Sequence, residues 1–221
     1  MDVRSAIALQ RKQFKTLPPK KKWEHILEYY KGWLLLGVIL IAITGYSIYT
    51  AQTRKEPVLY VTMVNASDSE SDVFQGFLEN VGLDSERSCI DMNAALELHL
   101  QSPSVQDAQT MEVLYALFGT GNLDLFAADD TVFDFFAQSG MLTDLRDYLP
   151  ESFLKENADR LHTVVLSSGG KEIVAGIYPT SDSRFGHAGY YEPAAPVGIV
   201  TNAINLGTAA AALMWLSAIP E

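Results

Sequence analysis

An uncharged run of 22 residues, from Gly32 to Thr53, lies between a basic N-terminal head and a strongly acidic body. An α-helix rises 1.5 Å per residue, so a helix of this length spans about 33 Å, whereas the hydrocarbon core of a bilayer is about 30 Å thick. Aromatic residues stand at both ends of the run, where interfacial belts occur in membrane proteins. They are Tyr29, Tyr30, Trp33, Tyr46 and Tyr49. The run therefore predicts a transmembrane helix over residues 32–53, with the lipid bilayer as a partner.

The charges around this run predict its orientation. Residues 1–31 hold eight Lys or Arg against three acidic residues, whereas residues 54–221 hold eight against 24. Because basic residues beside a span stay in the cytoplasm, we expect a single-pass plasma-membrane protein with a cytoplasmic N-terminus and an extracytoplasmic body. Two alternatives compete with this uncleaved signal-anchor. A cleaved secretory signal normally has a shorter head and a small-x-small cleavage site, and a buried core helix leaves the aromatic belts unexplained.

The basic head, residues 1–31, predicts an amphipathic juxtamembrane helix. Pro18 and Pro19 interrupt the chain, and apolar residues then recur at helical spacing. They are Trp23, Ile26, Leu27 and Tyr30. Basic side chains beside a span are attracted to anionic lipid by about 1 kcal/mol each. A topology signal without a further role explains this head as well as any specific function does.

The acidic body, residues 54–221, is long enough for one domain with its own core. Its excess of negative charge argues against nucleic acid as a partner, because phosphate would be repelled. The same charge suits cationic ligands, although a soluble, non-aggregating surface is the simpler explanation. Cys89 is the only cysteine. An internal disulfide and a multi-cysteine metal site are therefore excluded.

Strand and helix patterns alternate along the body and predict one compact mixed-sheet α/β domain. Strands are expected at residues 58–64, 88–93, 123–128, 163–166, 171–178 and 197–201. Helices are expected at residues 72–80, 104–118, 129–136, from about 151 to 160, and 206–216. The strands on either side of the turn at 168–170 form a hairpin, and residues 180–191 form a loop. The last helix is too short to be a second span.

The segment from Leu123 to Pro150 carries a resemblance to a known family. A strand, the residues Asp129-Asp130-Thr131, a short helix and then Gly140-Met141-Leu142-Thr143-Asp144-Leu145-Arg146-Asp147-Tyr148-Leu149 follow one another. This order resembles extracellular solute-binding proteins of the periplasmic-binding type 2 class. The strand at 197–202 and the helix through 209–216 are similar to the elements that close such proteins. Residues 29–31 and 57–61, around the predicted span, are similar to uncharacterised membrane-anchored proteins of clostridia-like Gram-positive bacteria.

The resemblance implies that the body corresponds to one lobe of a type 2 solute-binding protein. Complete members of the class have two lobes and are considerably longer than this body. A hinged clamp that buries its ligand by domain closure is therefore not expected. One open lobe would bind its ligand more weakly, or would need a partner protein in place of the second lobe.

Six polar residues are candidates for ligand contact, namely Asn65, Asp129, Asp130, Thr131, Ser181 and Tyr190. The first four follow predicted strands, and ligands of open α/β sheets bind beyond the carboxyl ends of strands. Asp and Thr are also preferred helix N-caps, so capping is the favoured explanation of residues 129–131. Asn65 has the same ambiguity. Ser181 and Tyr190 belong to the segment 180–191, for which a mobile, solvated loop is the favoured alternative.

Signatures of catalysis and of cofactor binding are missing from the sequence. The four histidines, at positions 25, 99, 162 and 187, have no His or Cys partner at metal-ligand spacing. The chain contains no G-x-S-x-G elbow, P-loop or G-x-G-x-x-G motif. We therefore expect neither an enzyme nor a bound cofactor or metal.

Two functions from different classes remain. The first is a membrane-tethered extracytoplasmic module that binds a small polar ligand and presents it to an ABC permease or senses it. The second is a degenerate lobe that has lost its ligand and docks another protein of the cell envelope as a structural or interaction protein.

Overall fold

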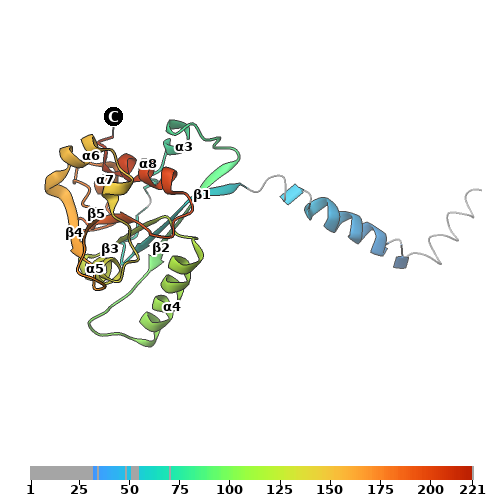
Figure 1. The fold of residues 1–221 in the computed structure, drawn as a ribbon. Coiled ribbons are helices and arrows are strands. Elements are labelled where there is room, and N and C mark those ends of the chain that lie inside the picture. The colour runs from blue at the N-terminus through green and yellow to red at the C-terminus, as the bar shows by residue number, and fades with distance from the viewer. Residues whose placement is uncertain (1–31, 34, 48, 51–54, 70, 221) are drawn as a thin grey trace, which may run out of the picture. The chain divides into compact units, whose positions relative to one another are not determined.

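The computed structural model describes residues 32–33, 35–47, 49–50, 55–69 and 71–220. The chain divides into two compact units, residues 1–54 and 55–221. In the first unit all described residues are helical (Figure 1), and large apolar side chains such as Leu35 and Ile41 are exposed. Within the described ranges, no helix meets both the length and the hydropathy needed to cross a membrane. The predicted head helix and residues 34, 48 and 51–53 of the predicted span lie outside the described residues.

The second unit is built on one mixed sheet of six strands in the order β2-β1-β3-β6-β5-β4. The strands are β1 (Glu56–Val64), β2 (Ser88–Leu96), β3 (Leu125–Ala128), β4 (Leu161–Val165), β5 (Glu172–Ile177) and β6 (Val197–Ile199). β1 pairs in parallel with β2 and β3, whereas β6 runs antiparallel to β3, and β4 and β5 form an antiparallel hairpin. The predicted mixed-sheet α/β domain is therefore confirmed.

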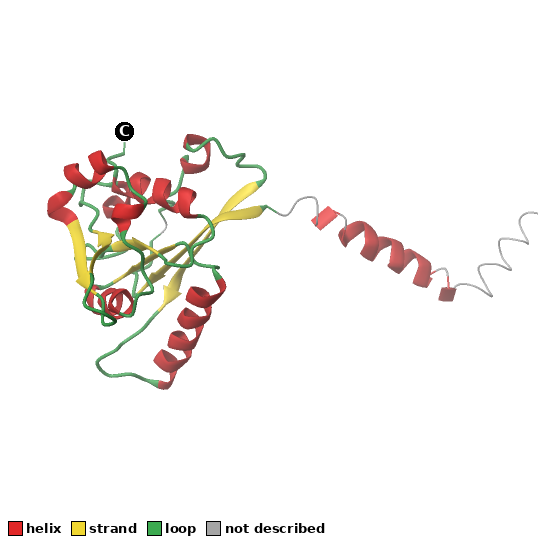
Figure 2. Cartoon of the chain, viewed as in Figure 1, coloured by secondary structure: helices red, strands yellow, loops and turns green. Residues whose placement is uncertain are grey.

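Helices and short helical turns connect the strands (Figure 2). They are α3 (Phe77–Asn80), α4 (Val105–Thr120), α5 (Asp130–Gln138), η1 (Leu145–Asp147), α6 (Glu151–Glu156), η2 (Ala158–Arg160), α7 (Arg184–Ala188) and α8 (Leu206–Ser217). Three predictions were wrong in detail. The helix expected from about 151 to 160 is divided at Asn157 into α6 and the short turn η2. The helix expected over residues 72–80 is shortened because Gly76 has a left-handed φ of 78°, which interrupts the helical backbone. The loop expected over residues 180–191 contains α7, whose N-cap Ser183 accepts a hydrogen bond from the Gly186 amide.

An aromatic cluster holds α4 and α5 against one face of the sheet. The Phe136 ring of α5 lies 4.9 Å from the Phe118 ring of α4 and 5.4 Å from the Phe126 ring of β3, between centroids. All four residues of β3 are buried, because helices cover both of its faces. α8 packs elsewhere, with Trp215 against Phe77 at 5.9 Å between ring centroids. The cluster fixes the start of α5 just beyond the carboxyl end of β3 (Figure 1).

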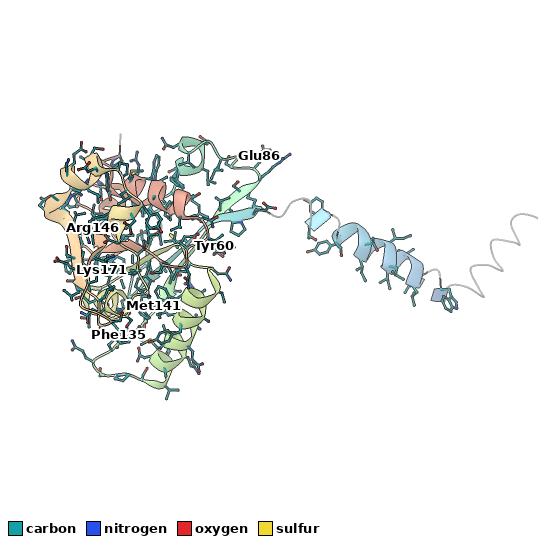
Figure 3. The ribbon with its side chains drawn as sticks, viewed as in Figure 1. Tyr60, Glu86, Phe135, Met141, Arg146 and Lys171 are labelled. Atoms are coloured by element: carbon teal, nitrogen blue, oxygen red, sulfur yellow. The ribbon has the colours of Figure 1, made fainter. Side chains whose placement is uncertain are left out.

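A fully buried carboxylate ties the opposite end of the sheet together. Asp124 stands just before β3, and its Oδ2 accepts hydrogen bonds from the Tyr60 amide at 2.9 Å and the Asn205 side chain at 3.0 Å. Its Oδ1 accepts a third from the Asn205 amide at 3.0 Å. A buried charge is tolerated when its oxygens are hydrogen-bonded in this way. Asp124 therefore anchors β1 and the start of α8 to β3 (Tyr60 is labelled in Figure 3).

Candidate functional site

A hollow of about 330 Å³ lies beyond the carboxyl ends of β1 and β3. These strands are parallel neighbours, and their last residues, Val64 and Ala128, are register partners. The segments that follow them therefore leave the sheet side by side, which is where ligands of open α/β sheets bind. The hollow is lined by Asn65, Ser67, Asp129, Asp130, Thr131, Tyr190, Tyr191, Glu192, Pro193, Ala194 and Ala195.

The structure brings most of the predicted contact residues to this one place. Asn65, Asp129, Asp130, Thr131 and Tyr190 all line the hollow, although they come from three separate segments of the chain. Ser181 is not one of the described residues that line it. The Ser181 hydroxyl instead lies 3.5 Å from the carboxylate of its neighbour Asp182. That any of these residues binds a ligand stays a prediction.

Asn65 joins the ends of three segments. Its backbone adopts a left-handed conformation with φ of 58°, which Asn tolerates better than most residues. The side chain accepts a hydrogen bond from the Leu98 amide at 2.7 Å and donates to the Leu98 carbonyl at 2.8 Å. The same amide nitrogen also donates to Asp129 Oδ2 at 2.5 Å. The end of β1 is thereby tied both to the segment after β2 and to the start of α5.

Asp129 is the N-cap of α5. Its Oδ1 accepts hydrogen bonds from the amides of Thr131 at 3.0 Å and Val132 at 3.2 Å. These amides would otherwise lack a partner within the helix. The capping role expected at this position is thus confirmed for Asp129. Both of its carboxylate oxygens are engaged within the protein, because Asn65 holds the other one.

The β4–β5 hairpin holds the two other acidic residues of α5. The Tyr178 hydroxyl, just after β5, donates to Asp130 Oδ1 at 2.8 Å, and His162 Nε2 of β4 lies 2.6 Å from Asp134 Oδ1. The rings of His162 and Tyr178 meet edge to face, with centroids 5.2 Å apart. Burial, together with the hydrogen bond to Asp130, raises the pKa of the Tyr178 hydroxyl. Tyr178 is therefore a protonated donor at neutral pH, which fixes Asp130 at the rim of the hollow.

Two adjacent tyrosines form the wall opposite α5. The Tyr190 hydroxyl donates to the Ser71 carbonyl at 2.8 Å. The Tyr191 hydroxyl lies 2.9 Å from the Val64 carbonyl and 3.1 Å from the Ala127 carbonyl, so it bridges the ends of β1 and β3. Burial raises the pKa of both hydroxyls, most strongly that of Tyr191. The sequence indicated Tyr191 as a residue of the loop 180–191 that could hydrogen-bond or stack, but not this bridge, because its two acceptors are far away along the chain.

Ser67, Glu192 and Pro193 also line the hollow and were not among the predicted contact residues. The sequence contained one signal for two of them. Glu192 and Pro193 follow the two tyrosines directly and stand shortly before the strand β6. A polar, aromatic segment next to a strand is a candidate for the wall of a site. Glu192 and Pro193 lie just past the loop 180–191 to which the prediction was limited.

A second hollow, of about 210 Å³, is also lined by Asn65 and Asp129, which are hydrogen-bonded to each other. It shares three lining residues, Asn65, Asp129 and Thr131, with the first hollow. Its remaining walls are Val132 and the segment 98–102 after β2. That segment is held by Asp107, which accepts a hydrogen bond from the His99 amide at 2.7 Å. Hydrogen bonds from Ser104 and His99 hold the pKa of the Asp107 carboxyl well below its usual range.

Two further hollows lie elsewhere on the second unit. One, of about 380 Å³, includes Arg184, whose guanidinium carbon lies 3.9 Å from the centroid of the Trp215 ring. Another, of about 370 Å³, is formed mainly by apolar residues around α6, among them Leu149, Leu154 and Leu161. Neither contains a predicted contact residue.

The polar groups of the site can bind a ligand by hydrogen bonds and charge, but they do not form a metal centre. Within the described part of the chain, no three His, Cys, Asp or Glu side chains are grouped so that they could hold a metal ion. The expectation of no enzyme and no cofactor stays a prediction.

Comparisons with models of protein families, with curated proteins and with solved structures found no match to this chain. The resemblance to type 2 solute-binding proteins therefore rests on the sequence motifs alone.

Proposed function

We propose that this chain is a membrane-anchored extracytoplasmic binding module that holds a small polar ligand in the hollow beyond β1 and β3. One observation carries the proposal. Five of the six residues that the sequence marked as ligand contacts line this one hollow, although they lie as far apart as Asn65 and Tyr190. The position agrees with the general rule for ligands in open α/β sheets. The proposal includes correspondence of the body to one lobe of a type 2 solute-binding protein.

The membrane anchor is part of the proposal. Residues 32–53 are uncharged, and the helix described over residues 35–47 exposes a continuous set of large apolar side chains. In water such a surface would be unfavourable, since burying apolar area contributes about 25 cal/mol per Å². A bilayer would cover it. The body would then stand outside the cytoplasm, and an ABC permease or another envelope protein would have to meet it at the membrane surface.

Topology is tested by a reporter fused after Glu221. A phosphatase that is active only outside the cytoplasm should be active in this fusion, whereas a cytoplasmic reporter at the same position should be inactive. The reverse pattern would overturn the proposed orientation. Extraction of the membranes with alkaline carbonate should leave the chain in the pellet, and release into the supernatant would argue against an anchor.

Ligand binding is tested by screening the full chain, purified in a mild detergent, against sugars, amino acids, short peptide amides and polyamines. Binding to the folded state should raise the melting temperature, by an amount that grows with ligand concentration. A ligand found in this way should no longer raise the melting temperature of the variant Thr131→Trp, because the new side chain would fill the hollow from the exposed first turn of α5. Exposed Gln106→Trp, in the first turn of α4, is the matched control. A screen without a hit would contradict the proposal.

A second candidate function, an interaction protein without a small-molecule ligand, is favoured by a different observation. The polar groups of Asn65 and Asp129 and the hydroxyl of Tyr191 are hydrogen-bonded within the protein. The apolar hollow around α6, bordered by Leu154 and Leu161, is a surface of the kind that protein partners cover. Co-purification of one stoichiometric envelope protein, lost on Leu154→Asp and retained when the hollow beside Asp129 is filled, would support this alternative.

A further inference from the structure

The two hollows lined by the hydrogen-bonded pair Asn65 and Asp129 are neighbours. They share Asn65, Asp129 and Thr131 as lining residues. Their volumes are about 330 and 210 Å³. A ligand that uses both must be elongated and must cross the bridge between Asn65 and Asp129. This bridge is rigid, because Asn65 is also held by the Leu98 backbone and Asp129 by the first turn of α5.

The two halves differ in chemistry. The larger hollow carries the carboxylates of Asp130 and Glu192, both exposed, and the tyrosine wall. The smaller hollow has no carboxylate of its own besides the shared Asp129. It is lined by Leu98, His99, Leu100, Gln101 and Ser102, and the His99 ring lies against Asp107, outside this lining. One half thus favours a positive charge, whereas the other favours an uncharged group with some apolar surface.

The N-terminus of α5, where an anion would usually bind, does not favour one. The N-terminus of a helix attracts anions through its free amides. In α5, however, the amides of Thr131 and Val132 already donate to Asp129 Oδ1. Among the described residues that line the two hollows, none is Lys or Arg. An anion would therefore meet Asp130 and Glu192 without a lysine or arginine to compensate, whereas an ammonium group has three donors that match carboxylate oxygens.

We propose that the ligand is an elongated amine of the short-peptide type, which places its terminal ammonium in the larger hollow beside Asp130 and Glu192. Its uncharged chain crosses the Asn65–Asp129 bridge and ends in the smaller hollow beside Leu98 and Gln101. The half-buried Tyr191, which also lines the larger hollow, borders the chain near the ammonium group. This inference rests on the proposed function and names the ligand class for the same site.

The test is calorimetric titration of the full chain in detergent with three probes. The first is the tripeptide amide Ala-Leu-Gln-NH2, the second is its N-acetylated form, and the third is alanine amide. The tripeptide amide should bind. Acetylation removes the positive charge, and the affinity should fall at least about tenfold, as expected for loss of a charge-assisted hydrogen bond. Alanine amide should also bind at least about tenfold more weakly, because it does not reach the smaller hollow.

Matched variants test which end of the tripeptide amide lies in which hollow. Asp130→Asn should weaken the tripeptide amide about tenfold and leave the acetylated form unchanged. Asp91→Asn, an exposed position on β2, removes the same charge away from the hollow and should change neither. Leu98 is buried and risks the fold, so Gln101→Trp, at an exposed position of the smaller hollow, is used to block the distal end. It should weaken the tripeptide amide but not alanine amide.

The outcomes separate this inference from the proposed function. Equal binding of the free and acetylated peptides, or no binding of the peptides while another solute from the screen binds in the hollow, overturns the inference and leaves the proposed function standing. Binding of the tripeptide amide that is insensitive to both Asp130→Asn and Gln101→Trp also overturns the inference. If neither the peptides nor any solute of the screen binds, both this inference and the proposed function are wrong.

Discussion

The side-chain amide of Asn65 donates to Asp129 Oδ2 across 2.5 Å, although the two residues are 64 positions apart in the sequence. This hydrogen bond joins the segments that follow β1 and β3, the two parallel strands at the centre of the candidate site. Both of its residues line the hollow of about 330 Å³ and the hollow of about 210 Å³. The geometry of the site therefore depends on a hydrogen bond that also holds together the segments after β1 and β3.

Replacing Asn65 should destabilise the body. Asn65→Ala removes the hydrogen bonds to Leu98 and Asp129 and places Ala, which tolerates the left-handed region less well than Asn, at a φ of 58°. We expect a loss of about 2–4 kcal/mol in the free energy of unfolding, measured by urea denaturation of the full chain in detergent. Asn65→Gly loses the same bonds without the backbone strain and should be about 1 kcal/mol less destabilised. Equal stability of wild type and Asn65→Ala would contradict the role given to this side chain.

Asp124 should be among the most sensitive polar residues of the fold. Asp124→Ala leaves the Tyr60 amide, the Asn205 amide and the Asn205 side chain without their acceptor in a buried place. We expect a loss of about 3 kcal/mol or more, because each buried donor left without a partner costs about 1–3 kcal/mol. Thermal unfolding followed by circular dichroism measures the effect. Asp91→Ala, at an exposed position of β2, is the control and should stay within about 0.5 kcal/mol of wild type.

Gly198 is required by the close approach of β6 to its neighbours. A β-carbon at this position would lie 2.4 Å from the Ala175 carbonyl oxygen and 3.0 Å from the Phe133 ring. Gly198→Ala should therefore lower the stability by about 2 kcal/mol or more, since the backbone has to move. Gly207→Ala has open space around the new methyl group and lies in α8, so it should raise the stability by about 0.5–1 kcal/mol. Opposite signs in the two variants are the expected result, and a Gly198→Ala variant as stable as wild type would refute the packing argument.

Asp144 should make the body sensitive to acid. Burial on its own would raise the pKa of this carboxyl, but hydrogen bonds from the Arg146 side chain and from the amides of Arg146 and Val174 outweigh it and hold the pKa below its usual value. The same Arg146 donates to the Glu172 carbonyl at 2.9 Å, beside the β4–β5 hairpin (Figure 3). A lowered pKa in the folded state gives stability that is complete above the unfolded pKa, about 3.9, and is lost as the pH falls through the folded value.

The expected result is a pH-dependent gap between wild type and Asp144→Asn. The melting temperature of the variant should be lower than that of wild type at pH 7, and the gap should narrow progressively below about pH 4. Asp159→Asn, in the 3-10 turn η2 and away from this ion pair, should show no such narrowing. A gap that is constant from pH 7 to pH 3 would show that the charge of Asp144 does not contribute.

Local patterns in the sequence predicted much of this fold. The β-branched and aromatic run before Asn65 predicted β1, and the spacing of apolar residues after Ser104 predicted α4. The structure adds a capping box from Ser104 to Asp107, which was not predicted. Asp129 was expected to cap α5, and it does. All of these features depend on residues within a few positions of one another, because periodicity and capping are local. The shortened α3 departs from its pattern because the left-handed Gly76 interrupts it.

The candidate site was predictable only in part, for the same reason. The general rule about strand ends indicated Asn65 and residues 129–131 separately. It did not indicate that Tyr191 bridges the carbonyls of Val64 and Ala127, 127 and 64 positions away. The sequence by itself determined the uncharged run, the acidic body, the alternation of strands and helices and the cap at Asp129. Only the tertiary structure decided the strand order β2-β1-β3-β6-β5-β4 and formed the two hollows beside Asn65 and Asp129. Strand neighbours and their closing loops are selected by packing between distant segments, and no local pattern specifies that packing.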